Sequence, residues 1–151
     1  MKIIFVCTGN TCRSPMAQAL FEKKALSEGL DICVESRGTN VYDDEVINPK
    51  AIEALAGVGI IGFTHDAQQL SKQDLEEADV VLTMTHQQKF YINKIFPDYK
   101  YKVFTICEYT TDSNNDVSDP YGKSQIFYNF CVNELSTLVD GLYEIIREQM
   151  E

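Results

Sequence analysis

The sequence predicts an α/β fold: a single three-layer domain over residues 1–151, in which a four-stranded parallel sheet has helices on both faces. Apolar, β-branched runs alternate with stretches of helical periodicity, a pattern typical of parallel strands joined by right-handed helical crossovers. The first of these runs, at residues 2–6, is continuously apolar and β-branched, as expected for a strand buried on both faces. No repeat or long linker divides the 151 residues, a length that suits one domain.

The first half of the chain predicts two strands, at residues 2–6 and 31–36. Between them, helical spacing begins near Ser14 and Gly29 ends it. A second helix opens at 48–49, where proline suits the first turn, and continues to residue 55. Ser71, with an aspartate three residues later, caps a short third helix. The first of these helices should present one apolar face, made of Met16, Ala17, Leu20, Phe21 and Leu26.

The second half predicts strands at residues 78–84 and 102–106, each with an apolar centre. Thr85 can cap a helix that carries Phe90, Ile92 and Ile95. A polar loop is expected over residues 110–122. The last helix has the clearest periodicity, and its apolar stripe is expected to be core: Phe127, Phe130, Cys131, Leu135, Leu138, Val139, Leu142, Ile145 and Ile146.

Composition excludes several classes of function. The formal net charge is −10, from 13 basic and 23 acidic residues, which disfavours binding to nucleic acid or to an anionic membrane surface. No apolar run reaches the ~18 residues of a membrane-spanning helix, and no signal peptide is recognisable, so we expect a cytoplasmic protein. The five cysteines form no CxxC pair, and only His65 and His86 accompany them. Neither a disulfide framework nor a metal site is therefore expected.

The loop after the first strand is the expected ligand site, because parallel sheets bind ligands beyond the carboxyl ends of their strands. It runs from Cys7 to Arg13, and Gly9 and Asn10 between them tolerate left-handed backbone. Such a loop can point its N–H groups, with those of the following helix, at an anion the size of phosphate. Arg13 can add a two-pronged contact to phosphate oxygens.

Cys7 is the expected nucleophile of this loop. A sulfur beside a helix N-terminus and a guanidinium should be present as the thiolate, aimed at the bound phosphorus. The alternative is a buried structural cysteine and a surface arginine. The context favours the site, because the cysteine closes a buried strand and the arginine precedes a helix. The GKS/T ending of a nucleoside-triphosphate loop and the dinucleotide motif GxGxxG are both absent here.

Asp119 is the expected general acid, since phosphoryl transfer to Cys7 requires a protonated leaving group. It lies in a loop after the fourth strand, on the sheet edge where Cys7 ends its own strand. Pro120 stiffens this loop and Tyr121 can form an aromatic wall. The alternative is an ordinary turn, for which Asp-Pro and Tyr-Gly are common material.

Residues 6–15, with the sequence VCTGNTCRSP, and the pair Asp119-Pro120 together resemble the low-molecular-weight protein tyrosine phosphatase family. The resemblance spans essentially the whole chain. Within the family, the sequence is most similar to the bacterial protein-arginine phosphatases, which share Thr11 and stretches like residues 84–87, 103–105 and 108–109. The resemblance implies strand order 2-1-3-4 and a phosphocysteine on Cys7. It also implies that Arg13 holds the phosphoryl oxygens and that Asp119 is first the acid and then the base for water.

The resemblance assigns roles to further residues. The substrate would be bound by Thr8, Gly9, Asn10, Thr11, Cys12, Ser14 and Tyr121. The loop would be held in shape by hydrogen bonds of Asn10, Ser14, Ser36 and His65, although a half-buried surface histidine is the plain alternative for His65. Cys12 would form a reversible disulfide with Cys7, unless it is simply a small buried residue. No cofactor is implied, and we expect a monomer that acts on arginine-phosphorylated or tyrosine-phosphorylated proteins.

Thr11 bears on the choice of substrate, because tyrosine-specific relatives tend to carry an isoleucine-like side chain there. A hydroxyl reduces apolar packing around an aromatic leaving group and offers a hydrogen bond to a guanidino group or to water. Acidic residues close to Asp119 in sequence would favour a cationic group, although such runs are usually a solvated face; they are Glu108, Asp112 and Asp116. Arg37 and Lys123 depart from the pattern of the relatives; either could alter substrate access, and neither belongs to the core machinery.

Two other functions fit the same loop. Arsenate reductases share it but relay electrons through two further cysteines, and residues 80–95 contain none. A phosphate-binding module or phosphocarrier needs the cysteine cradle but neither Arg13 nor Asp119. A phosphatase is therefore the preferred interpretation, with phosphoarginine as substrate and phosphotyrosine as the alternative.

Overall fold

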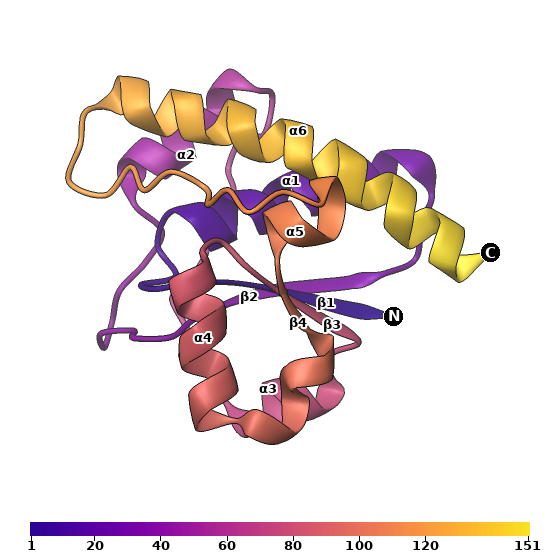
Figure 1. The fold of residues 1–151 in the computed structure, drawn as a ribbon. Helices are drawn as coiled ribbons and strands as arrows, with labels where there is room; N and C mark the ends of the chain where they lie inside the picture. The colour runs from indigo at the N-terminus through magenta and orange to yellow at the C-terminus, as the bar shows by residue number, and fades with distance from the viewer.

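The computed structural model describes residues 1–151 and confirms the predicted architecture. Four parallel strands form one sheet in the order β2-β1-β3-β4, with helices above and below it (Figure 1). The strands are β1 Lys2–Cys7, β2 Cys33–Gly38, β3 Val80–Thr83 and β4 Val103–Thr105. The strand order is therefore also as predicted.

The register of the sheet brings the carboxyl ends of the strands to one edge. Cys7 of β1 lies opposite Gly38 of β2, and Val6 lies opposite Thr83 of β3. The chain moves from β1 to β2 on one side and then crosses to β3 on the other, so β1 lies where the strand order reverses. A ligand site is expected beyond the end of a strand in this position.

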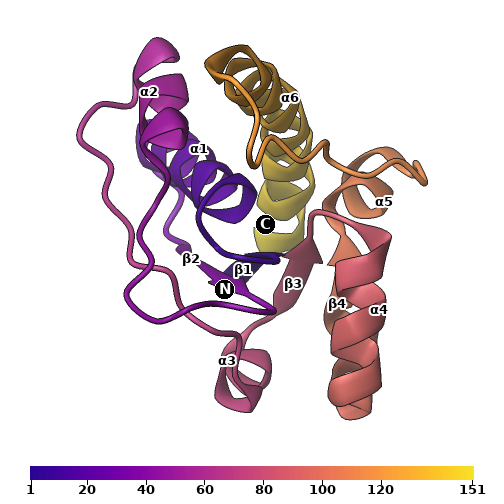
Figure 2. The same cartoon turned by 90° about the vertical axis from the view of Figure 1, so that its left-hand side faces the viewer.

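The helices cover the two faces of the sheet unequally, as Figure 2 shows in the second view. The larger core lies under α1 Arg13–Glu28, α2 Pro49–Gly57, α5 Ile106–Thr111 and α6 Gln125–Met150. The smaller core lies against α3 Lys72–Glu77 and α4 His86–Ile95. Side chains of β1 alternate between them: Ile3, Phe5 and Cys7 face the larger core, while Ile4 and Val6 face the smaller one. This alternation places the sulfur of Cys7 on the side of α1.

Several helix ends follow local signals in the sequence. α1 ends at Gly29, whose φ of 71° is a left-handed conformation that glycine adopts without strain. Asn48 caps α2 by accepting the N–H of Lys50. Capping boxes begin α3 at Ser71 and α4 at Thr85. No helix has both the length and the apolar character that crossing a bilayer requires.

Two predicted apolar faces were partly wrong. Leu26 is 85% exposed, and Ala25 takes its place in the core of α1, because position 26 is out of phase with the turns before it. On α6, Phe127 and Phe130 are exposed and Ile145 is only partly buried. The buried side of this helix instead includes Tyr128, Val132 and Tyr143.

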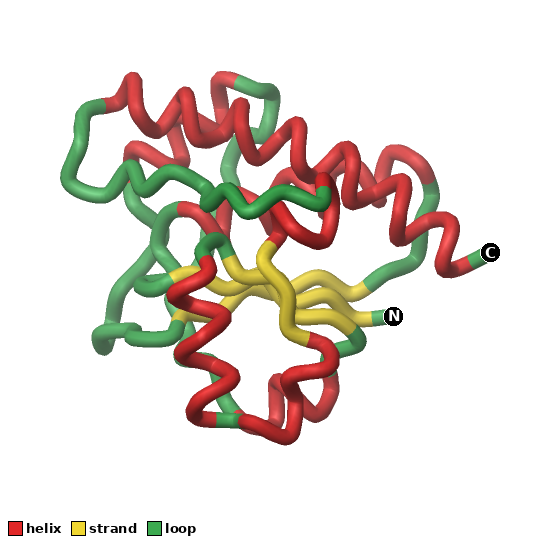
Figure 3. Tube along the Cα trace, viewed as in Figure 1, coloured by secondary structure: helices red, strands yellow, loops and turns green.

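The fourth strand is shorter than predicted. β4 ends at Thr105, whose side chain accepts the N–H of Glu108 in a capping box that starts α5. This helix occupies the end of the expected strand and the start of the expected loop, and a 3-10 helix, η1 Pro97–Lys102, precedes β4. The loop from α5 to α6 therefore begins at residue 112, and Figure 3 shows it as a long irregular segment along α6. The second strand also starts later than expected, at Cys33.

Candidate active site

The loop between β1 and α1 curls tightly against the segment that follows β2. Asn10 has φ of 58°, a left-handed conformation that asparagine tolerates better than most residues. Gly9, which was also expected to allow a left-handed backbone, does not have a positive φ. Gly38 permits the close approach, because a Cβ on it would lie 2.6 Å from the carbonyl oxygen of Thr8. The carbonyl oxygens of Cys7 and Thr8 accept the N–H groups of residues 39 and 40. The loop is thus fixed by backbone contacts with the segment that follows β2.

The side chain of Asn10 is the hub of a buried polar network. Its Nδ2 donates to Ser14 Oγ at 2.8 Å and to Ser36 Oγ at 3.1 Å. Its Oδ1 accepts the backbone N–H of Gln68 at 2.9 Å and lies 2.8 Å from Nε2 of His65. Every hydrogen-bonding position of the amide is therefore occupied. The four residues expected to support the loop do meet in one cluster.

His65 serves this network in its neutral form. Its Nε2 carries the hydrogen that Asn10 Oδ1 accepts, since that oxygen has no proton to give. The pKa of His65 is lowered, first by burial and then by the positive charge of Arg37. A neutral imidazole at physiological pH follows from both effects.

The sulfur of Cys7 faces two hydrogen-bond donors. The backbone N–H of Asn10 lies 3.2 Å from Sγ, and Oγ of Ser14 lies 2.9 Å from it. Ser14 Oγ already accepts from Asn10, so its one hydrogen can point at the sulfur, 2.9 Å away, or at the carbonyl oxygen of Arg37, 3.4 Å away. Cys7 is only 3% exposed, yet it lines the cavity described below. This environment suits an anionic sulfur that attacks from the floor of a pocket.

Arg13 is buried at the start of α1 and reaches the loop before α6. Nη1 donates to the carbonyl oxygen of Val117 at 3.3 Å, and Nη2 lies 3.6 Å from Oδ2 of Asp119. The side chain of Asp119 is 58% exposed on the rim, and its Oδ1 accepts the N–H of Tyr121 at 3.1 Å. A guanidinium fixed at one edge and facing the cavity can hold two oxygens of a phosphoryl group.

A cavity of about 550 Å³ opens over the loop. Most residues predicted for the site line it: Cys7, Thr8, Gly9, Thr11, Cys12, Arg13, Asp119 and Tyr121. Asn10 and Ser14 do not line it, because their side chains turn inward to the network. Both residues were expected to bind substrate and also to support the loop. The structure places their side chains where they can support the loop but not where they line the cavity.

The opposite wall of the cavity was missed by the sequence analysis. It comes from the segment between β2 and α2, namely Asn40, Tyr42, Glu45, Val46, Ile47, Asn48 and Pro49. A hydrogen bond from the N–H of Asn48 to the carbonyl oxygen of Thr11 ties this wall to the loop. The only signal for it was the Asn-Pro start of α2, which indicates a helix and not a ligand site.

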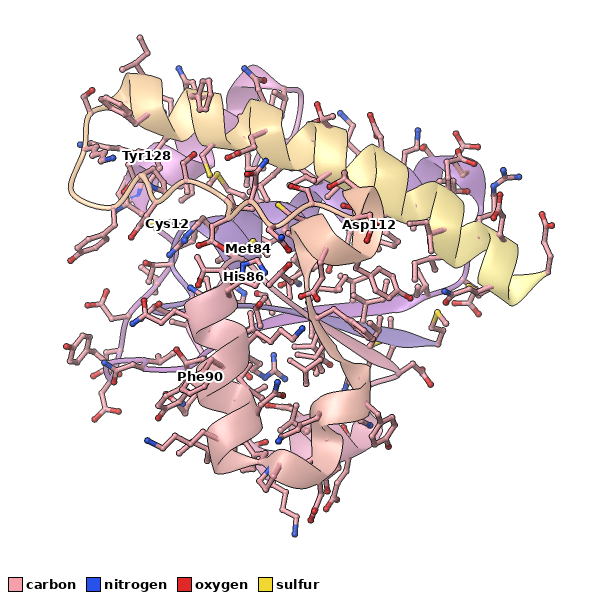
Figure 4. All side chains as sticks on the ribbon, viewed as in Figure 1. Cys12, Met84, His86, Phe90, Asp112 and Tyr128 are labelled. Atoms are coloured by element: carbon pink, nitrogen blue, oxygen red, sulfur yellow. The ribbon has the colours of Figure 1, made fainter.

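The acidic residues expected near the rim lie elsewhere. Glu108 caps α5 and pairs with Lys89, and Asp116 accepts from the backbone and ring of His86. Asp112 ends α5 in a left-handed conformation. Figure 4 shows Asp112 well to the right of Cys12, at the end of α5. The cavity's carboxylates are instead Glu45 and Asp119.

The two departures from the pattern of the relatives also differ from expectation. The guanidinium of Arg37 is held by Glu35 at 2.7 Å and by Asp74 at 3.1 Å, and it does not line the cavity. It cannot alter access there. Lys123 lies outside the same cavity, where its Nζ sits over the ring of Phe127.

Two functional neighbours of the loop were not found from the sequence. Gln88, in the capping box of α4, donates from Nε2 to Oγ1 of Thr8 at 3.1 Å while its Oε1 accepts two backbone N–H groups. The hydroxyl of Tyr128 lies 3.5 Å from Sγ of Cys12, and Figure 4 shows both residues at the same end of the molecule. Burial raises the pKa of Cys12. Cys12 is therefore a protonated thiol in this state.

The arrangement combines a cysteine sulfur, amide donors, a guanidinium and a carboxylate around one cavity. This is the equipment of phosphoryl transfer to cysteine: a nucleophile, charge stabilisation for the phosphoryl oxygens, and an acid for the leaving group. No three His, Cys, Asp or Glu side chains gather as metal ligands would.

Comparisons with known proteins agree with this chemistry. The model of the family "Low molecular weight phosphotyrosine protein phosphatase" matches residues 2–151. A protein-arginine-phosphatase of Bacillus subtilis (strain 168) is 45% identical over 148 residues, which cover 98% of each chain. The low molecular weight protein-tyrosine-phosphatase PtpB of Staphylococcus aureus is 35% identical over 146 residues, covering 97% of this chain and 99% of its own.

One similar solved structure carries a phosphoryl group on an active-site residue. A mutant of YwlE arginine phosphatase with a phosphorylated active-site serine superposes with a TM-score of 0.94 at 44% identity. The match covers 97% of this chain and 96% of that one.

Proposed function

Because this chain belongs to the low molecular weight phosphotyrosine protein phosphatase family and is a cysteine phosphatase, we propose that it hydrolyses phosphoarginine residues of proteins through a phosphocysteine. The whole of residues 1–151 acts as the catalytic domain. The observation that carries the proposal is the sulfur of Cys7 at the floor of a cavity, between an amide donor and Ser14, with Arg13 and Asp119 on the same cavity.

In the first step, Sγ of Cys7 attacks phosphorus while the loop amides and Arg13 hold the three phosphoryl oxygens. The P–N bond to the guanidino group breaks, and the electron pair of that bond takes the proton of Asp119. The products are a phosphocysteine and an unmodified arginine, which leaves. The guanidinium of Arg13 stabilises the charge that develops on the oxygens.

In the second step, the carboxylate of Asp119 takes a proton from water, whose oxygen attacks phosphorus. The S–P bond breaks, inorganic phosphate forms, and the thiolate of Cys7 is regenerated. The phosphorylated active-site serine of the YwlE mutant supports a covalent intermediate of this kind. The five cysteines are unpaired in the structure, which suits a nucleophile that works in the reducing cytoplasm.

The choice of phosphoarginine rests on the chemistry of the cavity and on the relatives. Glu45 and Asp119 place two carboxylates on its lining, which favours a leaving group that departs as a cation. Thr11 contributes a hydroxyl to the same lining. The relative at 45% identity is a protein-arginine-phosphatase.

A phosphotyrosine substrate is the second candidate, and one observation favours it. Tyr42 and Tyr121 both line the cavity and are largely exposed, so they offer aromatic faces to an aromatic leaving group. The relative from Staphylococcus aureus is a protein-tyrosine-phosphatase.

A side-by-side measurement of kcat/KM on phosphoarginine and phosphotyrosine forms of one peptide decides between the two. We expect the ratio to favour phosphoarginine and to shift toward phosphotyrosine in Thr11→Ile, since the added apolar surface packs against an aromatic ring. A wild-type ratio that favours phosphotyrosine would overturn the proposed substrate. An unchanged ratio in Thr11→Ile would remove Thr11 as the selector.

A further inference from the structure

A second cavity lies on the other side of the Asp119-Pro120 turn from the catalytic one. It measures about 400 Å³ and is lined by Ser118, Asp119, Pro120, Lys123, Ile126, Phe127 and Phe130. Asp119 lines both cavities. We call the second one the α6 groove, because three of its lining residues lie in the first two turns of α6.

The floor of the α6 groove is apolar and open to solvent. Ile126 is 70% exposed, Phe127 is 49% exposed and Phe130 is 64% exposed. Positions 126, 127 and 130 share one side of a helix. Single exposed apolar residues are ordinary on a protein surface, but a contiguous cluster around a cavity marks a binding site.

The charge around the groove is unlike that of the rest of the chain. The chain has 23 acidic residues among 151, yet residues 120–133 contain none and carry a single basic residue, Lys123. Its Nζ lies 5.1 Å from the ring centroid of Phe127. The groove is thus an apolar surface with one cation, Lys123, and one carboxylate, Asp119, at its edge, in a protein whose net charge is −10.

We propose that the α6 groove receives an apolar side chain of the phosphoprotein substrate, from a residue close in sequence to the phosphorylated one. The proposal rests on the proposed function, because it assumes that the substrate chain crosses the rim of the catalytic cavity. A chain extended over the Asp119-Pro120 turn advances about 3.3 Å per residue. Because Asp119 lines both cavities, the residue expected to reach the groove is a near neighbour, within roughly four residues of the phosphorylated one.

The size of the groove favours a substrate side chain over a second copy of the protein. Stable protein–protein interfaces engage about 20–30 residues a side, whereas seven residues line this groove. A cavity of about 400 Å³ suits one or two side chains. Its shared wall with the catalytic cavity is what a substrate chain bound at both would require.

The test compares peptides and variants together. Phosphoarginine peptides that carry leucine, or serine, at each position within four residues of the phosphorylated one are assayed with wild type and with Phe130→Ser. We expect leucine to raise kcat/KM on the order of tenfold at one or two positions with wild type, and Phe130→Ser to remove most of that preference. Leu26→Ser is the control, since Leu26 is also an exposed apolar residue on a helix, at 85% against 64% for Phe130, but lines neither cavity.

Hydrolysis of p-nitrophenyl phosphate, which has no flanking residues, should be unchanged in Phe130→Ser. Equal kcat/KM for the leucine and serine peptides at every position would overturn the groove proposal. The same peptides with phosphotyrosine separate it from the proposed substrate: a leucine preference there, without hydrolysis of phosphoarginine, would uphold the groove and overturn the substrate. Self-association of wild type that Phe130→Ser abolishes, with no leucine preference, would assign the groove to a second copy instead.

Discussion

The phosphate loop, residues 7–14, and the acid loop, residues 112–124, meet at one cavity but are built in opposite ways. In the phosphate loop the polar side chains of Asn10, Arg13 and Ser14 are buried, and Asn10 has every hydrogen bond it can make. In the acid loop the side chains of Val117 and Pro120 are buried, while that of Asp119 is 58% exposed. One loop is fixed through its buried side chains, whereas the other is held by backbone hydrogen bonds around Val117 and leaves the carboxyl of Asp119 on the rim.

The difference separates two demands of phosphoryl transfer. Binding a phosphoryl group requires donors that already point at its oxygens, because reorienting them at the moment of reaction would raise the barrier. Protonating a leaving group requires only that a carboxyl reach it, and leaving groups differ in size. A change in the phosphate loop should therefore affect folding and catalysis together, whereas a change at the exposed Asp119 should affect catalysis alone.

The largest effect is expected from Cys7→Ser, which removes the nucleophile and leaves the cradle. We expect turnover of p-nitrophenyl phosphate to fall by more than about 10⁴-fold, because a serine hydroxyl is a much poorer nucleophile here. Phosphate binding, measured by calorimetry, should persist. Activity close to that of wild type would refute Cys7 as the nucleophile, and loss of phosphate binding would show that the cradle depends on the sulfur.

Asp119→Ala tests the acid loop. We expect kcat on a phosphoarginine peptide to fall about 10²–10⁴-fold, the usual range for loss of a general acid. The free energy of unfolding in urea should change by less than about 0.5 kcal/mol, since the side chain is exposed. An unchanged kcat would exclude Asp119 as the acid, and a large loss of stability would remove the contrast between the loops.

Asn10→Ala makes the matching test in the phosphate loop. It removes four hydrogen bonds of a buried amide and places alanine at a φ of 58°. We expect the free energy of unfolding to fall by roughly 2–4 kcal/mol, with lower kcat in the fraction that remains folded. If urea unfolding of Asn10→Ala matched that of Asp119→Ala, the two loops would not differ as described.

His65 gives the smallest effect, one that depends on pH. Its pKa in the folded protein is lowered from the ordinary value of 6.5 by burial and by Arg37. Between the folded and unfolded values the unfolded chain binds more protons, so stability falls as pH falls through about 6.5. His65→Gln removes this titration and can still donate to Asn10. Urea midpoints between about pH 7.5 and about pH 5.5 should fall more steeply for wild type; parallel curves would contradict the account.

Local signals in the sequence were sufficient for most of the fold. Continuous apolar runs identified the strands, and caps at Asn48, Ser71, Thr85 and Gly29 identified helix ends. α5 was missed because its capping residue, Thr105, is also the last residue of an apolar strand, so the capping box with Glu108 overlaps the strand signal in the sequence. The face of α6 was misassigned because apolar residues occupy two of its sides, and only tertiary packing shows that the Tyr128 side is buried.

The site divides in the same way. The spacing of Cys7 and Arg13 after a buried strand indicated an anion-binding loop, and this is local information. The wall from Asn40 to Pro49 arises where a separate loop folds over the first, so no local pattern marks it. The charges around Asp119 also depend on the tertiary fold and could not be predicted from neighbours in sequence. Glu45, which is distant in sequence, lines the cavity, whereas Glu108, which is closer in sequence, is paired with Lys89.

The most direct test of the account is to look for the phosphoryl group on the protein during turnover. Asp119→Ala should slow both steps, so rapid mixing with a phosphoarginine peptide, quenching and mass spectrometry can find an intermediate. We expect one phosphoryl group on the proteolytic fragment that contains Cys7, and none there in the Cys7→Ala, Asp119→Ala double variant. Release of phosphate with no phosphorylated protein at any time, or a phosphoryl group on another residue, would contradict the account.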